Sequence, residues 1–142
     1  MAALSRNGRT IGYRVSGSGP AVLAFHGTTQ SSNAWDQVRD AMTEERTWIS
    51  FEFPGSGESS MPTGPLDLDE IVDDALALMT DLGHGTFHVT GYSLGAVAAL
   101  RAAAAAPERV SSVTSLCGWS RTDARMRATF DLGGRLIAIG PE

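Results

Sequence analysis

The sequence predicts an α/β fold, with a mostly parallel sheet and crossover helices. Two observations lead to this prediction. Short apolar runs alternate along the chain with longer segments whose apolar residues recur at helical spacing. Several of the short runs are continuously apolar, which is typical of strands buried on both faces of a parallel sheet. With 142 residues, of which 42% are hydrophobic and 19% charged, the chain can bury one core, so we expect one domain.

The first half of the chain supplies three predicted strands and one helix. Residues 9–15 (RTIGYRV) end at a glycine- and proline-rich turn, and the continuous apolar run at 21–27 (AVLAFHG) follows that turn. The segment 33–45 predicts a crossover helix, because its apolar residues lie at helical spacing: Trp35, Val38 and Met42. Residues 47–53 (TWISFEF) return as a strand.

Residues 66–83 predict a helix with recognisable ends. Asp67 and Glu70 have the spacing of a capping pair at its start, and Gly83 supplies its stop. Between them the sequence marks an apolar face, made of Ile71, Val72, Ala75, Leu78, Met79 and Leu82. We then expect a strand at 86–91, a helix at 93–106 and a further strand at 109–118.

Composition and charge exclude several classes of protein. The net charge of −5, without a run of lysine or arginine, argues against a nucleic-acid surface or an anionic membrane patch. The longest apolar stretch, between Arg101 and Pro107, is too short to span a membrane. Cys117 is the single cysteine and cannot form an internal disulfide, and the N-terminus lacks the apolar core of a signal peptide. We therefore expect a soluble, cytoplasmic protein.

The pentapeptide Gly91-Tyr92-Ser93-Leu94-Gly95 stands at a predicted strand-to-helix junction. It fits the G-x-S-x-G nucleophile elbow, in which a sharp turn projects the serine hydroxyl from the sheet. Glycines are needed where a Cβ would collide with backbone, and the following helix directs its N-terminal N–H groups at the site. The alternative is a serine that caps the helix, and the pentapeptide alone does not decide between the two.

Two loops elsewhere support the elbow. His26-Gly27 ends a strand and leads toward a helix, so the N–H of Thr28 can face that of Leu94 as a second oxyanion donor. The segment 52–59 (EFPGSGES) ends the next strand with a glycine-rich loop. In this order and at these separations, the motifs resemble the α/β-hydrolase fold family, in particular its lid-bearing esterase, perhydrolase and haloperoxidase-like branch. The resemblance runs from about Arg9 to the C-terminus.

The resemblance implies roles for individual residues. Ser93 would be the nucleophile, and the N–H groups of Thr28 and Leu94 would form the oxyanion hole. A supporting loop would comprise His26, Gly27, Gly91 and Gly95. The family's loop after the fourth strand usually begins with aspartate, whereas this chain has Glu52, which is one methylene longer.

A serine nucleophile needs a histidine to accept its proton and an acid to orient that histidine. In this fold they follow the serine in the order acid, then histidine. The acidic residues after the motif are Glu108, Asp123, Asp131 and Glu142, and no histidine follows it. Asp123 could be a variant acid, with a helix N-cap as the alternative. His84 and His88 are expected to be ordinary histidines, because a turn-to-strand placement does not suit a metal, and we expect none.

The chain is therefore expected to be an incomplete domain, with about six of the family's eight strands. Residues 1–118 would form the core, and residues 119–142 the start of a lid, whose helical tail Gly133 and Gly134 weaken. By resemblance the acid and histidine lie on the missing strands. A fragment, one piece of a split protein and a degenerate copy all remain open.

We expect a serine hydrolase that acts on an ester, thioester or related carbonyl through an acyl-enzyme. The alternative is a non-catalytic binding or structural half-domain. Pocket walls are expected from Trp35, Tyr92 and Trp119, and apolar residues of the tail suggest a small hydrophobic substrate: Met126, Phe130, Leu136 and Ile137. No cofactor is expected, because the near-fingerprint at 55–60 is followed by prolines that forbid the helix a dinucleotide requires.

Overall fold

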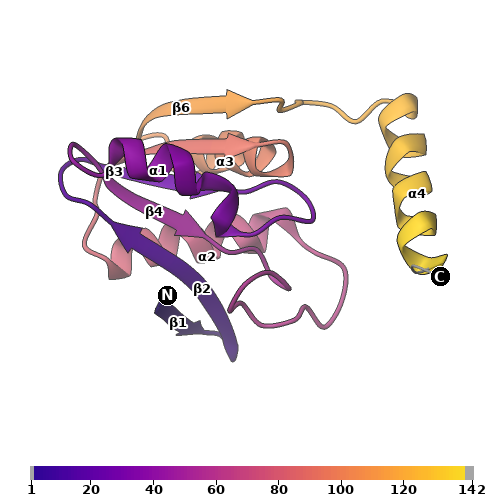
Figure 1. Ribbon diagram of the computed structural model, residues 1–142, viewed down its shortest axis with the longest axis horizontal. Coiled ribbons are helices and arrows are strands. Elements are labelled where there is room, and N and C mark those ends of the chain that lie inside the picture. The colour runs from indigo at the N-terminus through magenta and orange to yellow at the C-terminus, as the bar shows by residue number, and fades with distance from the viewer. Residues whose placement is uncertain (1, 140–142) are drawn as a thin grey trace.

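The computed structural model describes residues 2–139, which form one six-stranded sheet in the order β1-β2-β4-β3-β5-β6 (Figure 1). The strands are β1 (Ala2–Arg6), β2 (Arg9–Ser16), β3 (Ala21–Phe25), β4 (Thr47–Phe51), β5 (Phe87–Tyr92) and β6 (Val110–Leu116). The four strands β4, β3, β5 and β6 are parallel, while β1 and β2 join the sheet antiparallel. The predicted α/β class with a mostly parallel sheet is confirmed.

Strand β1 has no counterpart among the predicted ranges. It pairs with β2 through a tight hairpin at Asn7-Gly8, whose φ angles are 52° and 73°. Both angles lie in the left-handed region that a type I′ turn requires, and Asn-Gly is the strongest short signal for such a hairpin. The dipeptide therefore carried the information that places this strand.

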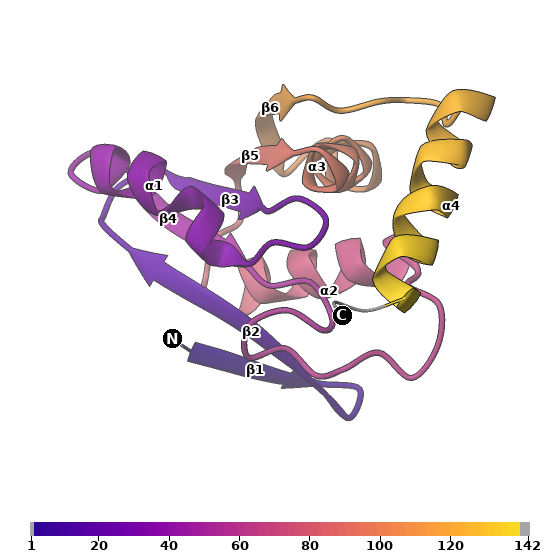
Figure 2. The same cartoon turned by 45° about the vertical axis from the view of Figure 1, so that its right-hand side comes forward.

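Helices cover both faces of the sheet (Figure 2). On one face lie α2 (Leu68–Asp81) and α3 (Leu94–Ala105), which pack against each other. The other face carries α1 (Asp36–Met42), which a short 3₁₀ turn at Ser32–Trp35 precedes. Successive side chains of β3 point to opposite faces of the sheet. Leu23 and Phe25 belong to the core on the side of α2 and α3. Val22 and Ala24 belong to a smaller cluster on the other side, with Trp35 and Trp48. Strand β3 is buried throughout, as its apolar run predicts.

The start of α2 differs in one detail from the sequence prediction. Asp67 is the N-cap, as predicted, and its side chain accepts a hydrogen bond from the N–H of Asp69 at 2.8 Å. Glu70 does not return to the cap; its carboxyl bonds Arg9 of β2 at 2.7 Å instead. Glu70 is therefore paired with Arg9 and does not complete a capping box with Asp67.

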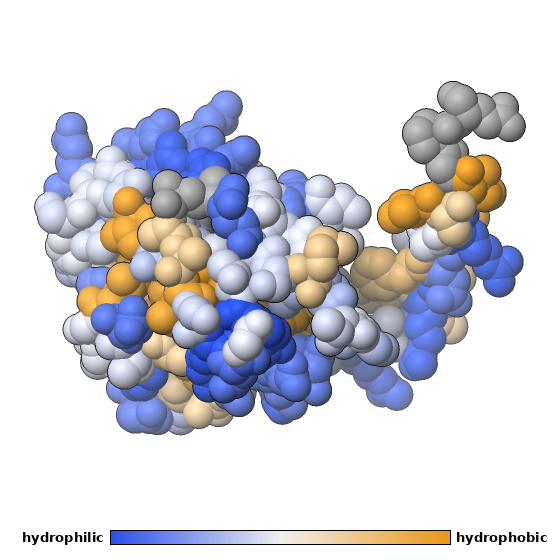
Figure 3. Space-filling view, turned by 90° about the horizontal axis from the view of Figure 1, so that it is seen from below, coloured by the Kyte–Doolittle hydropathy of each residue, from blue (hydrophilic) through white to orange (hydrophobic). Residues whose placement is uncertain are grey.

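The last two elements are the least covered part of the described chain. Strand β6 lies at the edge of the sheet, and most of its residues are exposed. Helix α4 (Ala124–Ile139) projects from the body and has no buried residue (Figures 1 and 3). Apolar side chains of α4 are exposed to solvent, among them Phe130, Leu136 and Ile137. Within residues 2–139, no helix is both long and apolar enough to cross a bilayer.

Candidate active site at the carboxyl ends of β3 and β5

Ser93 joins β5 directly to α3 and has an unusual backbone. Its φ of 55° and ψ of −118° lie outside the regions that non-glycine residues prefer. The N–H of Ser93 donates to the carbonyl of Leu116 at 2.9 Å, and its own carbonyl accepts from the N–H of Ala96 at 3.0 Å. Its side chain makes no capping hydrogen bond, so the alternative that the serine hydroxyl caps α3 is wrong. Such a conformation persists only where the surrounding structure holds it.

The two glycines of the motif are needed for steric reasons. A Cβ on Gly91 would meet the carbonyl of Gly95, and a Cβ on Gly95 would meet the carbonyl oxygens of Phe25 and His26. All of these neighbours are backbone atoms, which cannot move aside as side chains do. The elbow is therefore packed directly against the end of β3.

The register of the sheet brings the ends of β3 and β5 side by side. Phe25 pairs with Gly91 in parallel register. Thr28 lies three residues beyond Phe25, and Leu94 lies three residues beyond Gly91. Both backbone N–H groups therefore belong to the segments that leave the same edge of the sheet, from two neighbouring strands. Neither N–H has a protein acceptor among residues 2–139. Ligands of open α/β sheets bind outside the carboxyl ends of the strands, which is where these donors lie.

His26 is a buried brace beneath this loop. The residue is 1% exposed, its Nδ1 donates to the carbonyl of Gly27 at 2.8 Å, and its Nε2 accepts from the N–H of Phe53 at 3.2 Å. Burial lowers the pKa of the imidazole, against the smaller raising effects of the Gly27 carbonyl and of Glu52. Both ring nitrogens are occupied in the neutral tautomer, so this ring is not free to accept a proton from a serine.

Glu52 forms a second buried brace, which links β4 to the start of the 3₁₀ turn. Its carboxyl accepts from the hydroxyl of Ser32 at 2.5 Å and from the N–H of Ser32 at 3.1 Å. Both residues are almost fully buried. A Cβ on Gly57 would lie 2.5 Å from the Glu52 carboxyl carbon, so glycine at that position makes room for the longer side chain. Sequence reasoning did not find Ser32, which shows no motif of its own.

A hollow of about 250 Å³ lies beside the elbow. Its lining is mostly apolar and comes from Gln30, Ala34, Trp35, Val38, Tyr92 and Leu116. Two predicted pocket walls, Trp35 and Tyr92, therefore lie in one hollow. Trp119 does not join them; its ring packs on Phe130 of α4 at a centroid distance of 5.7 Å and its indole donates to Thr122 at 3.2 Å.

The remaining candidate residues lie away from the elbow or have other partners. Asp123 accepts from the N–H of Met126 at 2.8 Å, which confirms the alternative that it caps the following helix; its role as an acid stays a prediction. His88 lies near the start of β5 and contacts Ser112 of β6 at 2.8 Å. His84 precedes that strand, at the opposite end from Ser93. In the part of the chain that the structure describes, no group of three or more acidic, histidine or cysteine side chains could hold a metal.

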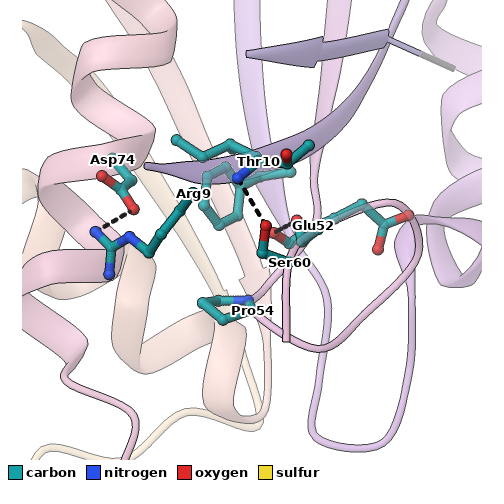
Figure 4. Close-up of a pocket in the computed structure, with 9 residues that line it drawn as sticks. Arg9, Thr10, Glu52, Pro54, Ser60 and Asp74 are labelled. Atoms are coloured by element: carbon teal, nitrogen blue, oxygen red, sulfur yellow. Dashed lines mark hydrogen bonds and ion pairs between the residues drawn. The ribbon is translucent and has the colours of Figure 1, made fainter. Parts of the chain in front are cut away.

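A separate small pocket lies between β2, the loop after β4 and α2 (Figure 4). Its volume of about 10 Å³ is enough for roughly one water molecule. At one side the guanidinium of Arg9 donates to the buried carboxyl of Asp74 at 2.9 Å (Figure 4). At the other side the backbone N–H of Thr10 donates to the hydroxyl of Ser60 at 2.8 Å (Figure 4). These contacts hold the loop and helix to the sheet, so we interpret the pocket as structural.

Comparisons with known proteins agree with this fold. A family model described as the alpha/beta hydrolase fold matches residues 20–140. The protein "Putative carbamate hydrolase RutD" of Azorhizobium caulinodans is 31% identical over 131 residues, which cover 92% of this chain and 49% of that protein. The 2-(acetamidomethylene)succinate hydrolase of Mesorhizobium japonicum is 33% identical over 107 residues, which cover 75% of this chain and 38% of that protein.

A solved structure shows the same architecture. A hydrolase from Pseudomonas aeruginosa superposes with a TM-score of 0.85 at 23% identity, over 95% of this chain and 52% of that one. At this identity the likeness shows the fold alone. The chain spans about half the length of the relatives it matches, so its fold is a truncated form of theirs. The matched family model, the sheet order and the two relatives agree: this chain belongs to the α/β-hydrolase fold family.

Proposed function

We propose that the chain is the N-terminal part of a serine hydrolase in which Ser93 attacks a carbonyl carbon and forms an acyl-enzyme. The backbone of Ser93 is the observation that carries the proposal. A φ of 55° at a non-glycine residue costs free energy, on the order of 1–3 kcal/mol, and such strain clusters at functional sites. The hydroxyl of Ser93 makes no capping hydrogen bond to α3, so the helix does not use it.

The N–H groups of Thr28 and Leu94 would stabilise the negative oxygen that develops on the attacked carbonyl. Neither has a protein acceptor within residues 2–139, and Leu94 begins α3, where the helix dipole favours negative charge. The leaving group would depart with a proton, and water would then release the acyl group from Ser93. These steps need a general base that accepts the proton of the serine.

No histidine of the described chain is placed to be that base. His26 is buried with both nitrogens occupied. His88 lies five positions before Ser93 on an extended strand, a separation of about 16 Å at 3.3 Å per residue. We therefore propose that the base and its acid come from a segment that follows this chain, in cis or in trans, with Asp123 as a candidate for the acid. Helix α4 would begin the lid in the same enzyme.

The substrate is proposed to be a small molecule with a hydrophobic group beside an ester, thioester or related carbonyl. The mostly apolar hollow at Trp35 and Tyr92 supports the hydrophobic group. The names of the two relatives, a carbamate hydrolase and a hydrolase of an acetamido compound, add carbonyls bonded to nitrogen to the classes that should be assayed.

The second candidate is a half-domain that binds or supports a partner without catalysis. The occupied ring of His26 favours it, because the described chain then has an elbow without a base. Extending the coding sequence beyond residue 142 discriminates between the two, since the enzyme requires an acid and a histidine there or on a partner chain.

The direct test is Ser93→Ala in the longer protein. p-Nitrophenyl ester, carbamate and amide substrates would be assayed, with circular dichroism to show that the variant keeps its fold. We expect turnover to fall to background, because only the weak effect of the oxyanion donors remains. Turnover equal to that of the parent would reject Ser93 as the nucleophile.

A further inference from the structure

Among residues 2–139, three hydrogen bonds hold the backbone N–H and carbonyl of Gly27, and Gln30 makes two of them. Its side-chain Oε1 accepts from the N–H of Gly27 at 2.8 Å, and its backbone N–H donates to the carbonyl of Gly27 at 3.3 Å. The third bond comes from the ring of His26. Because a backbone N–H can only donate, the carboxamide must present its oxygen to Gly27.

The loop that Gln30 closes is strained. Residues 27–30 form a four-residue turn, and its third residue, Thr29, has a φ of 62°. This is the left-handed region, where a β-branched residue is a rare outlier. A strained turn keeps its shape only if its surroundings hold it, so the two bonds of Gln30 oppose relaxation of the turn.

Gly27 also lies close to the elbow. A Cβ on Gly27 would lie 2.7 Å from Oε1 of Gln30 and 2.9 Å from Cδ1 of Tyr92, the residue before Ser93. Gly27 is therefore held between the side chain of Gln30 and the ring that precedes the serine. Any rotation of the Gly27 peptide groups would move the N–H of Thr28, which follows directly.

We propose that Gln30 is a positioning residue: its carboxamide takes up the N–H of Gly27, locks the strained turn and so keeps the N–H of Thr28 directed at the developing oxyanion. This inference rests on the proposed function, because it assigns Gln30 to the oxyanion loop of that reaction. It adds a residue that the G-x-S-x-G and His-Gly motifs do not contain.

The test uses Gln30→Met in the longer protein, because methionine has a similar length but lacks the amide acceptor. The matched control is Gln37→Met, the same substitution at an exposed position of α1 outside the hollow. Active sites would be counted with a fluorophosphonate that labels serine nucleophiles, so that kcat refers to folded enzyme only. Phenylboronic acid would probe the oxyanion hole, since its tetrahedral adduct places an oxygen there.

We expect Gln30→Met to lower kcat per labelled site at least 10-fold, while KM stays within 3-fold of the parent. The same variant should bind phenylboronic acid at least 10-fold more weakly. Gln37→Met should leave both kcat and phenylboronic acid binding unchanged. A kcat per labelled site within 2-fold of the parent would overturn the proposal for Gln30 while leaving Ser93 in place. Full activity of Ser93→Ala would instead reject the proposed function itself.

A second variant covers the case in which Gln30→Met does not fold. Gln30→Glu keeps an acceptor oxygen for Gly27, and 0.5 M NaCl screens the charge that it adds. A positioning role predicts that this variant folds and keeps a kcat per labelled site within 3-fold of the parent. A folded Gln30→Glu variant whose kcat per labelled site is at least 10-fold below that of the parent would contradict the role of the acceptor.

Discussion

The backbone N–H of Ser93 donates to the carbonyl of Leu116 at 2.9 Å, so the elbow is tied to the last residue of β6. This strand is the edge of the sheet, with β5 as its neighbour on one side only. The position of the proposed nucleophile therefore depends on an exposed strand. Any disturbance of β6 should reach Ser93 through this bond.

The 142-residue chain, purified alone, should not turn over esters in a Ser93-dependent way and should associate with itself. The unpaired edge of β6 and the exposed apolar residues of α4 both favour association. Ester hydrolysis and sedimentation over a range of concentrations measure the two properties. Thr114→Lys, exposed on β6, should reduce association more than Ala104→Lys, exposed on α3. A stable monomer with serine-dependent turnover would contradict this prediction.

Gly95→Ala should destabilise the protein by about 3 kcal/mol or more, because the new Cβ meets two backbone carbonyl oxygens of β3 and its loop. Gly133→Ala is the matched control, since nothing lies within 4 Å of a Cβ there. In helix α4 it should stabilise by up to about 1 kcal/mol. Urea unfolding of both variants measures the difference, and similar stabilities would show that the elbow can relax.

Stability should fall as the pH drops below about 6.5, because the folded state binds the His26 proton less readily than the unfolded state does. Burial lowers the pKa of His26 from its ordinary value of 6.5, so the unfolded chain gains the proton first. The contribution of this residue to the free energy of unfolding therefore falls between pH 7.5 and 5.5. Urea unfolding of the parent and of His26→Asn at both pH values isolates it, since the other histidines are common to both. An equal pH dependence in the two proteins would exclude His26 as the cause.

Asp74→Ala should cost more stability than Glu70→Ala, although both residues bond Arg9 from α2. The side chain of Asp74 is 4% exposed and also bonds Arg6, whereas that of Glu70 is 62% exposed. Charged hydrogen bonds at a buried site contribute about 2 kcal/mol, against less than about 1 kcal/mol for an exposed pair. Thermal unfolding of the two variants provides the comparison, and the reverse order would mean that the buried carboxyl is not well compensated.

The sequence predicts most of the sheet because its strands are set by local patterns. The run at 21–27 is continuously apolar and both of its faces are buried, so pattern and environment agree. Strand β1 was missed because it is too short to show a pattern of its own, and its signal is the Asn7-Gly8 turn that pairs it with β2. The capping prediction for Glu70 was wrong in part, since a distant arginine competes for the same carboxyl.

In the site, too, local features were predicted and contacts between distant residues were not. Ser93 and its glycines follow from a short motif, whose steric demands are local. The bonds of Ser32 to Glu52 and of Leu116 to Ser93 join residues about twenty positions apart, and neither pair has a spacing rule that a single sequence reveals. Gln30 lies only three residues from Gly27, but glutamine has no preferred turn position that would have marked it.

The order of the strands has a consequence for synthesis of the protein. After β4 has been made, β5 joins the sheet beside β3 and β6 joins beside β5, so each new strand extends the same edge without separating strands already paired. A nascent chain can therefore assemble this sheet progressively as it leaves the ribosome. The hydrogen bond from the N–H of Ser93 to the carbonyl of Leu116 can form only after Leu116 has left the ribosome, so the elbow is completed later than the strand that leads into it.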